Sequence, residues 1–181
     1  WNLEYRMSTL VIKELSAPAG EVIKVAAGKT LDLKSQGTTT LPTGSVLQVV
    51  SATQDDTTAI VTTSSTYVTT GFNATITPSS TSSKIRIDAS FMADAGTNGC
   101  NIYFHIQRGS TSLGGSQQDA NSAIALVGNS RLLINMPFSY LDSPSTASAV
   151  TYELYMKVVG GTVRYKPDQC LSSLILTEIQ G

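Results

Sequence analysis

The sequence is poor in the residues that carry most enzyme chemistry. It has one histidine, His105, one tryptophan, and two cysteines, Cys100 and Cys170, with no CxxC motif for zinc or redox work. Charged residues make up 14% of the chain, where soluble proteins average roughly 25%. The net charge is −1. With neither sign in excess, we expect no nucleic-acid partner.

Long hydrophobic runs are also missing. No stretch reaches the ~18 apolar residues that a membrane span needs, so membrane insertion is not expected. The first residues, WNLEYRMSTL, lack the apolar segment of a secretory signal. Met7 resembles a natural initiator, and residues 1–6 are interpreted as a tag or an upstream extension.

Serine and threonine are abundant, with 23 of each, and hydrophobic residues make up 41% of the chain. This composition predicts a folded chain with a neutral polar surface. Threonine favours strands, and serine hydroxyls bond to neighbouring backbone in turns. The length favours one domain with a small appendage.

Strand patterns are frequent and helix patterns are weak. Alternation is clear in KIRIDASFMA, where Ile85, Ile87, Ala89 and Phe91 share one side. Turn-forming stretches such as TPSSTSS and VGGT separate the strands at roughly ten-residue spacing, which indicates an all-β, antiparallel, jelly-roll-like β-sandwich. The predicted strands are 46–52, 59–63, 66–70, 72–77, 84–93, 100–107, 122–127, 131–141, 150–159, 162–165 and 171–179.

The N-terminal part has a different pattern. AGEVIKV, from Ala19, and AGKTLDL, from Ala27, match at an offset of eight residues. Each copy is a glycine turn followed by a strand too short to bury its own apolar face. The repeat therefore predicts either a trimeric β-prism or a hairpin packed on the main domain. We expect a β-repeat anchor or shaft over residues 7–41 and the main domain over residues 42–181.

No motif predicts a catalytic, cofactor-binding or metal-binding residue, and no cofactor is expected. His105 lies on a strand without a GxSxG-like context, so it is interpreted as structural. Asp55 and Asp56 are adjacent, and adjacent side chains on an extended chain point oppositely, which favours a solvated turn. The cysteines are interpreted as thiols, with a single disulfide as the alternative. Most of the aromatic residues on strands are interpreted as core or inter-chain residues, with a sugar-stacking platform as the alternative; they are Tyr67, Phe72, Tyr103, Tyr140, Tyr152, Tyr155 and Tyr165.

The segment from Leu41 to Ile179 resembles a domain at the C-terminal end of tail fibre and appendage proteins of marine bacteriophages, including those of cyanobacteria. The matching phrases occur in the family's order: LPTGSVLQVVSAT, TITPSSTSSKIRIDASF, IQRGSTSLGGS, SYLDSPSTASAVTYELYMK, GGTVRY and LSSLILTEI. The stretch TLVIKELSAPAGEVIKVAAGKTLDL is similar to short β repeats in fibre shafts.

The resemblance implies a non-enzymatic structural protein of the virion, a homotrimeric jelly-roll knob that attaches the particle to the host cell. It would be made in the host cytoplasm and would contact other virion proteins through its N-terminal region. Its partner on the host would be a surface glycan or protein. The loops between strands would contact this partner, because their sequence can vary without disturbing the core. The longest polar breaks, candidates for these loops, are Asp94–Gly99, Ser110–Ala120 and Leu141–Ser148.

Two alternatives remain open from the sequence. Fewer than forty residues precede the predicted knob, which also suits a capsid decoration or head fibre protein of the same fold. An enzyme that cleaves a host polysaccharide is a further class, against which the missing acid–base pair argues.

Overall fold

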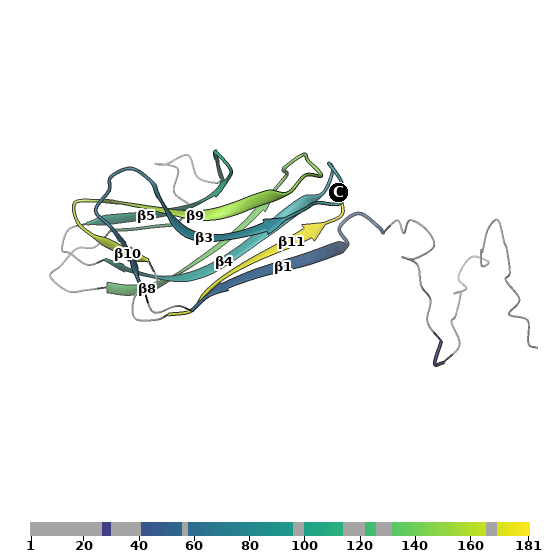
Figure 1. Ribbon diagram of the computed structural model, residues 1–181, viewed down its shortest axis with the longest axis horizontal. Coiled ribbons are helices and arrows are strands. Elements are labelled where there is room, and N and C mark those ends of the chain that lie inside the picture. Colours follow the sequence, from purple (N-terminus) through teal and green to yellow (C-terminus); the bar gives the residue numbers. More distant parts are fainter. Residues whose placement is uncertain are drawn as a thin grey trace, which may run out of the picture. The chain divides into compact units, whose positions relative to one another are not determined.

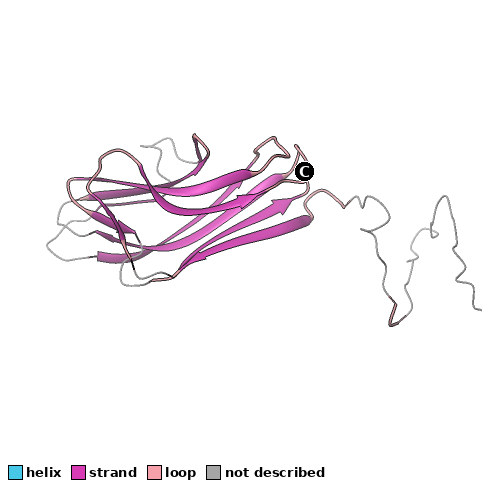
Figure 2. Ribbon diagram, viewed as in Figure 1, coloured by secondary structure: helices cyan, strands magenta, loops and turns pink. Residues whose placement is uncertain are grey.

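The computed structural model describes residues 27–29, 41–55, 58–95, 100–113, 122–125, 132–165 and 170–181. Every regular element among these residues is a β-strand (Figure 2). In the part of the chain so described, no helix is long and apolar enough to cross a membrane. The strands are β1 (Val46–Gln54), β2 (Ile60–Thr62), β3 (Val68–Ile76), β4 (Lys84–Ala95), β5 (Asn101–Arg108), β6 (Thr111–Leu113), β7 (Ser122–Ala125), β8 (Leu132–Asp142), β9 (Val150–Val159), β10 (Val163–Tyr165) and β11 (Ser172–Ile179).

Two antiparallel sheets lie face to face (Figure 1). One has the main order β1-β11-β4-β8, and the other has the order β3-β9-β5-β7. The first strand therefore pairs with the last, and strands that follow one another mostly alternate between the sheets, which is the arrangement of a jelly roll. The short strands β10 and β2 extend the first sheet, and β6 pairs with the end of β5. The all-β jelly-roll-like sandwich predicted from the sequence is confirmed.

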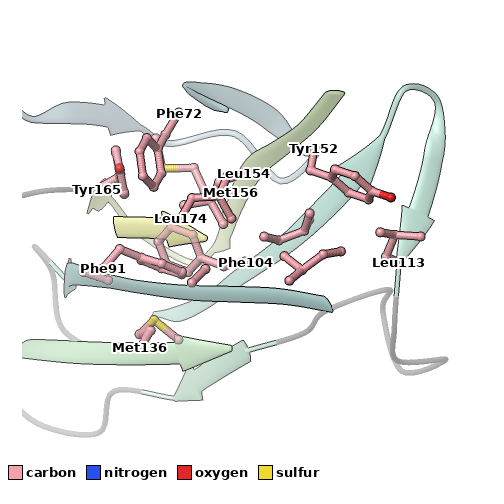
Figure 3. Close-up of a cluster of buried hydrophobic side chains, with 14 of the residues drawn as sticks. Phe72, Phe91, Phe104, Leu113, Met136, Tyr152, Leu154, Met156, Tyr165 and Leu174 are labelled. Carbon is pink, nitrogen blue, oxygen red and sulfur yellow. The ribbon is translucent and has the colours of Figure 1, made fainter. Parts of the chain in front are cut away.

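Alternation along the strands decides which side chains form the core. In β4 the residues Ile85, Ile87 and Phe91 are buried, as their pattern predicts. Figure 3 shows the rings and aliphatic side chains that meet between the sheets. Phe91 of one sheet and Phe104 of the other have ring centroids 4.8 Å apart. Burying each large apolar side chain contributes about 1.5–3 kcal/mol to folding, so this layer holds the two sheets together.

One strand differs from its prediction. The segments predicted as two strands, 66–70 and 72–77, form the single strand β3. Its register against β9 shifts between Thr69 and Asn73, and Gly71 within the shift has a φ of 71°. A glycine adopts this left-handed conformation at low cost, so it supports a β-bulge where the sequence suggested a turn. The three-residue strand β6 was not predicted.

The two ends of the sandwich carry different parts of the chain. At one end, here called the base, the Gly44 N–H donates to the Gln180 carbonyl and the Gln180 N–H donates to the Ser45 carbonyl, both at 2.8 Å. Figure 1 shows the C-terminus beside the start of β1. The loops 77–83 and 143–149 also lie at the base, because the start of β4 pairs with the ends of β11 and β8 there. The opposite end, here called the tip, holds β2 and β10.

The predicted receptor loops do not lie together at one end of the sandwich. Leu141–Ser148 comprises the end of β8 and a loop at the base. Asp94 and Ala95 belong to β4, next to the tip. Residues 96–99 and 114–120 lie outside the described residues.

The contacts divide the chain between Thr40 and Leu41, and all described strands belong to the unit Leu41–Gly181. Of the predicted N-terminal repeat, only residues 27–29 are described, with a turn at Gly28. The anchor over residues 7–41 and the extension over residues 1–6 therefore stay predictions. Both cysteines are free thiols, Cys100 buried and Cys170 half-buried.

Candidate functional site

The outer face of the sheet β3-β9-β5 carries a group of aromatic, charged and polar side chains that contact one another. Odd-numbered residues of β5 and β9 face outward, because their even-numbered neighbours are buried. Pairing then places His105 opposite Tyr155 and Tyr103 opposite Lys157. We call this group the outer cluster, and it consists of Tyr67, Thr69, Tyr103, His105, Gln107, Ser112, Glu153, Tyr155 and Lys157.

His105 lies at the centre of the outer cluster. Its ring stacks on Tyr67 with centroids 3.7 Å apart and meets Tyr155 at 5.8 Å in a tilted arrangement. The Gln107 amide nitrogen lies 2.8 Å from Nε2, and the Ser112 hydroxyl lies 3.2 Å from Nδ1. With the amide donating to Nε2, the neutral ring carries its proton on Nδ1 and donates to Ser112. His105 is only 2% exposed, so its ring is almost fully covered by its neighbours.

Lys157 places its ammonium group against two tyrosine rings. Its Nζ lies 4.4 Å from the Tyr67 centroid and 5.1 Å from the Tyr103 centroid. These distances are within the range of cation–π attraction, which is worth about 0.5–1 kcal/mol at exposed sites. The lysine therefore helps to fix Tyr67, which precedes β3, onto strands β5 and β9.

Glu153 ties the outer cluster to the bulge in β3. Its carboxylate accepts hydrogen bonds from the Thr69 hydroxyl and, at 3.4 Å, from the Tyr155 hydroxyl. The Thr69 hydroxyl oxygen in turn accepts a bond of 2.8 Å from the Gly71 N–H, so the bulge aims Thr69 at Glu153. Burial, and then the charge of Glu153 and the hydrogen bond to it, raise the pKa of Tyr155.

A second polar network closes the core at the base. The carboxylate of Glu178 is fully buried and accepts bonds from the Ser79 N–H (2.7 Å), the Ser79 hydroxyl (2.6 Å), the Ser83 hydroxyl (2.7 Å) and the Gln48 amide (2.6 Å). Burial raises the pKa of Glu178, but these hydrogen bonds lower it by more, so the pKa lies below its ordinary value. The serines of TPSSTSS therefore hold a buried carboxylate as well as forming a turn.

A second buried carboxylate, Asp142, lies at the end of β8, the strand that pairs with β4. Glu178 pairs with Ile85 and Ile85 pairs with Asp142, so both carboxylates face inward in one row across the sheet. The Tyr152 hydroxyl donates to Asp142 at 2.8 Å. The Arg108 Nε lies 3.1 Å from the same oxygen, as an ion pair without hydrogen-bond alignment. We call the side chains of Gln48, Ser79, Ser83, Arg108, Asp142, Tyr152 and Glu178 the base network.

The base network has a structural role. Arg108 also donates to the Pro144 carbonyl at 3.0 Å and so fastens the loop after β8 to the end of β5. Burial, with the hydrogen bond to Asp142 and the charge of Asp142, raises the pKa of Tyr152 and keeps its hydroxyl as a donor. Asp142 and Glu178 are buried and bonded by protein donors, so these two carboxylates are not presented to an external ligand.

The candidate residues named from the sequence fall into three groups. Asp55 is exposed, and Asp56 lies outside the described residues. Tyr152, Tyr165 and Phe72 are core residues, whereas Tyr67, Tyr103 and Tyr155 join the outer cluster. Among the residues with a described structure, no group of three or more His, Cys, Asp or Glu is arranged to hold a metal ion. Lys157 and Glu153 were not named as candidates from the sequence. The alternation along β9, which places both on its outward side, was the signal that could have identified them.

No protein-family model matches the chain, and no curated protein matches it. Among solved structures, the VP2 subviral particle of infectious bursal disease virus matches 84% of this chain and 37% of its own, at 15% identity and a TM-score of 0.46. The Gx strain of that virus matches 84% and 36%, at 14% identity and a TM-score of 0.47. The Bacillus endospore appendages, a family of disulfide-linked pili, match 71% and 96%, at 21% identity and a TM-score of 0.23.

This chain thus spans little more than a third of the length of the viral proteins that it matches.

Proposed function

We propose that this chain is a structural protein of a bacteriophage particle, a tail fibre or appendage knob that attaches the particle to the host cell surface. Two features support the proposal: the ordered phrases shared with phage appendage domains, and a jelly roll, a fold that viral capsid and lectin domains use. The observation that carries it is the outer cluster, a partly exposed group of rings and polar side chains held on a rigid sheet.

A binding role suits this cluster better than catalysis. His105 has protein partners at both ring nitrogens and is almost fully buried, so it is badly placed to take a proton from an external substrate. Glu153 and Asp142 already accept hydrogen bonds from protein donors: Glu153 from Thr69 and Tyr155, and Asp142 from Tyr152. The proposal is therefore non-enzymatic.

The base of the knob suits attachment to the rest of the particle. Gly44 and Gln180 are hydrogen-bonded at this end, and residues 7–41 precede Gly44 in the chain. We propose that these residues contact other virion proteins and that the chain is a homotrimer. Light scattering on a sizing column tests the second point, with three times 19.1 kDa expected for the full chain. A monomer would contradict it.

The direct test is to locate the protein on intact particles of the phage that encodes it. Gold-labelled antibody raised against the purified chain is expected at the tail, and the purified chain is expected to slow adsorption of particles to host cells. Gold on the head with no effect on adsorption would support the alternative, a capsid decoration or head fibre protein. Particles without any label would overturn both.

A further inference from the structure

We propose that the outer cluster binds a neutral saccharide of the host surface, with a sugar ring over the tyrosines of β5 and β9. This inference rests on the proposed attachment function and names the class of ligand for the same site. It is carried by three properties of the face: its rings, its row of hydrogen-bonding groups and its balance of charge.

The rings supply an apolar platform. Tyr103 and Tyr155 stand on the neighbouring strands β5 and β9, and both are partly exposed. The Tyr155 hydroxyl donates to Glu153. The axial C–H groups of a pyranose present an apolar face that suits such rings, and tyrosine is favoured at binding surfaces because one end is apolar and the other is wet. His105 stacks on Tyr67 and meets Tyr155 in a tilted arrangement, so the platform is already ordered before a ligand arrives.

Polar groups form a row directly beside the rings. Strand pairing places Ser112 opposite Gln107, Gln107 opposite Glu153, and Glu153 opposite Asn73. A carboxylate has about four acceptor positions, and Glu153 uses two of them for Thr69 and Tyr155. Because Glu153 is partly exposed, sugar hydroxyls could donate to the remaining positions. Asn73 is exposed at the end of the row and extends it by a side-chain amide.

The charges of the face favour a neutral ligand. Among the described outward-facing side chains of β3, β5, β6 and β9, the formal charges are Lys157 and Glu153, one of each sign. Such a face offers little attraction to a polyanion, which would need an excess of positive charge. The fully buried centre of a protein interface is more apolar than its rim, whereas Thr69, Asn73 and Thr151 keep this face polar.

The test uses polysaccharide released from the envelope of the host bacterium and split by anion exchange into neutral and acidic fractions. With the full chain immobilised, interferometry is expected to show binding of the neutral fraction, and periodate oxidation of the sugars should abolish it. Tyr155→Ala should weaken binding about tenfold, the loss of one stacking contact. Glu153→Gln should weaken it by less, about threefold.

The matched control is Tyr140→Ala. Tyr140 is also a partly exposed tyrosine, at 36%, but it lies on β8 in the other sheet, where it stacks near Phe138. Its removal is expected to leave binding unchanged. Equal thermal unfolding midpoints for the variants would show that any loss is a loss of contact. Should Tyr155→Ala prove unfolded, Glu153→Gln carries the test alone.

Several outcomes would overturn the inference. Salt-sensitive binding of the acidic fraction alone would point to a charged ligand, and binding destroyed by protease but not by periodate would point to a protein. Equal losses in Tyr140→Ala and Tyr155→Ala would place the contact elsewhere. If labelled particles and slowed adsorption support attachment while neither fraction binds, the saccharide is wrong and the proposed function stands. If particles lack the protein, the proposed function fails whatever the sugar assay shows.

Discussion

The base network and the outer cluster are built from the same kinds of side chain but differ in their exposure to water. Each contains a glutamate, a tyrosine, a serine and a glutamine. Glu178 is fully buried and takes four protein hydrogen bonds, whereas the partly exposed Glu153 takes two. The buried carboxylate has little capacity left for a ligand, and the exposed one keeps acceptors that water occupies until something replaces it.

This difference shows which polar side chains stabilise the fold and which remain able to bind a partner. A buried charge must be bonded, because leaving it without partners costs far more than each bond contributes. A partly exposed network is screened by water, so its bonds add little to folding. We therefore expect substitutions in the base network to reduce stability and leave binding intact. Substitutions in the outer cluster should weaken binding and leave stability nearly unchanged.

The largest effect is expected from Asp142→Ala. The change leaves the Tyr152 hydroxyl buried without its acceptor and Arg108 without its counter-charge. Removing one partner of a buried pair typically costs 3–5 kcal/mol, and because Arg108 is partly exposed we expect about 3 kcal/mol at this site. Urea denaturation of the purified chain measures it.

The control for Asp142→Ala is Asp88→Ala. Asp88 pairs with Arg86 at 2.8 Å on the outer face of the other sheet, where Arg86 is mostly exposed. An exposed pair contributes about 0–1 kcal/mol, so this variant should unfold almost as the parent does. Similar losses in both variants would contradict the distinction between buried and exposed networks.

The next effect is expected from Glu178→Gln, and it depends on pH. The pKa of Glu178 is lowered in the folded protein, so its contribution to stability is full above the pKa of the unfolded chain and is lost as pH falls through the folded pKa. At pH 7 we expect the variant to lose about 2 kcal/mol, since the amide cannot accept at both positions. The free energies of unfolding of variant and parent should converge in acid.

Denaturant unfolding from pH 7 downward tests this sign. A gap between parent and Glu178→Gln that stays constant, or grows, as pH falls would contradict it. Glu153→Gln serves as the control in the outer cluster, because Glu153 is partly exposed and its gap should be small throughout.

Most strand positions could be predicted because alternation is a local property. The segment Val150–Val159 was predicted and found with the same bounds, and its inward set of Tyr152, Leu154 and Met156 is buried. Gly71 misled the prediction, since a glycine at φ 71° serves a turn and a bulge equally well and only the pairing with β9 distinguishes them. The domain boundaries remain predictions.

The two networks could not be predicted, because their members are distant in the sequence. Nothing near Glu178 signals burial, and the partners that hold it come from Gln48 and from the serine loop, 130 and 99 residues away. For the outer cluster, the alternation of side chains along a strand predicts that Tyr155 and Lys157 face outward. It does not predict which strand lies beside them. Pairing of β9 with β5 supplied Tyr103 and His105.

A smaller effect is expected from Gly71→Val in the bulge beside the outer cluster. A Cβ at Gly71 would meet nothing within 4 Å, so the cost arises from the left-handed backbone alone. A β-branched residue there should lose about 1–2 kcal/mol. Gly71→Asn is the matched control, because asparagine tolerates this conformation and should lose less. Thermal unfolding measures both, and equal losses would contradict a backbone cause.

The smallest effect is expected from Tyr155→Phe, which keeps the ring and removes the hydroxyl that donates to Glu153. That bond is long, at 3.4 Å, and partly exposed, so at pH 7 the loss should stay below about 0.5 kcal/mol. Because the pKa of Tyr155 is raised in the folded protein, its contribution is present below the unfolded pKa and is lost as pH rises through the folded one. Unfolding measured at rising alkaline pH should therefore bring parent and variant together, opposite in direction to Glu178→Gln. A gap that widens in alkali would mean that the Tyr155 hydroxyl does not serve as a donor to Glu153.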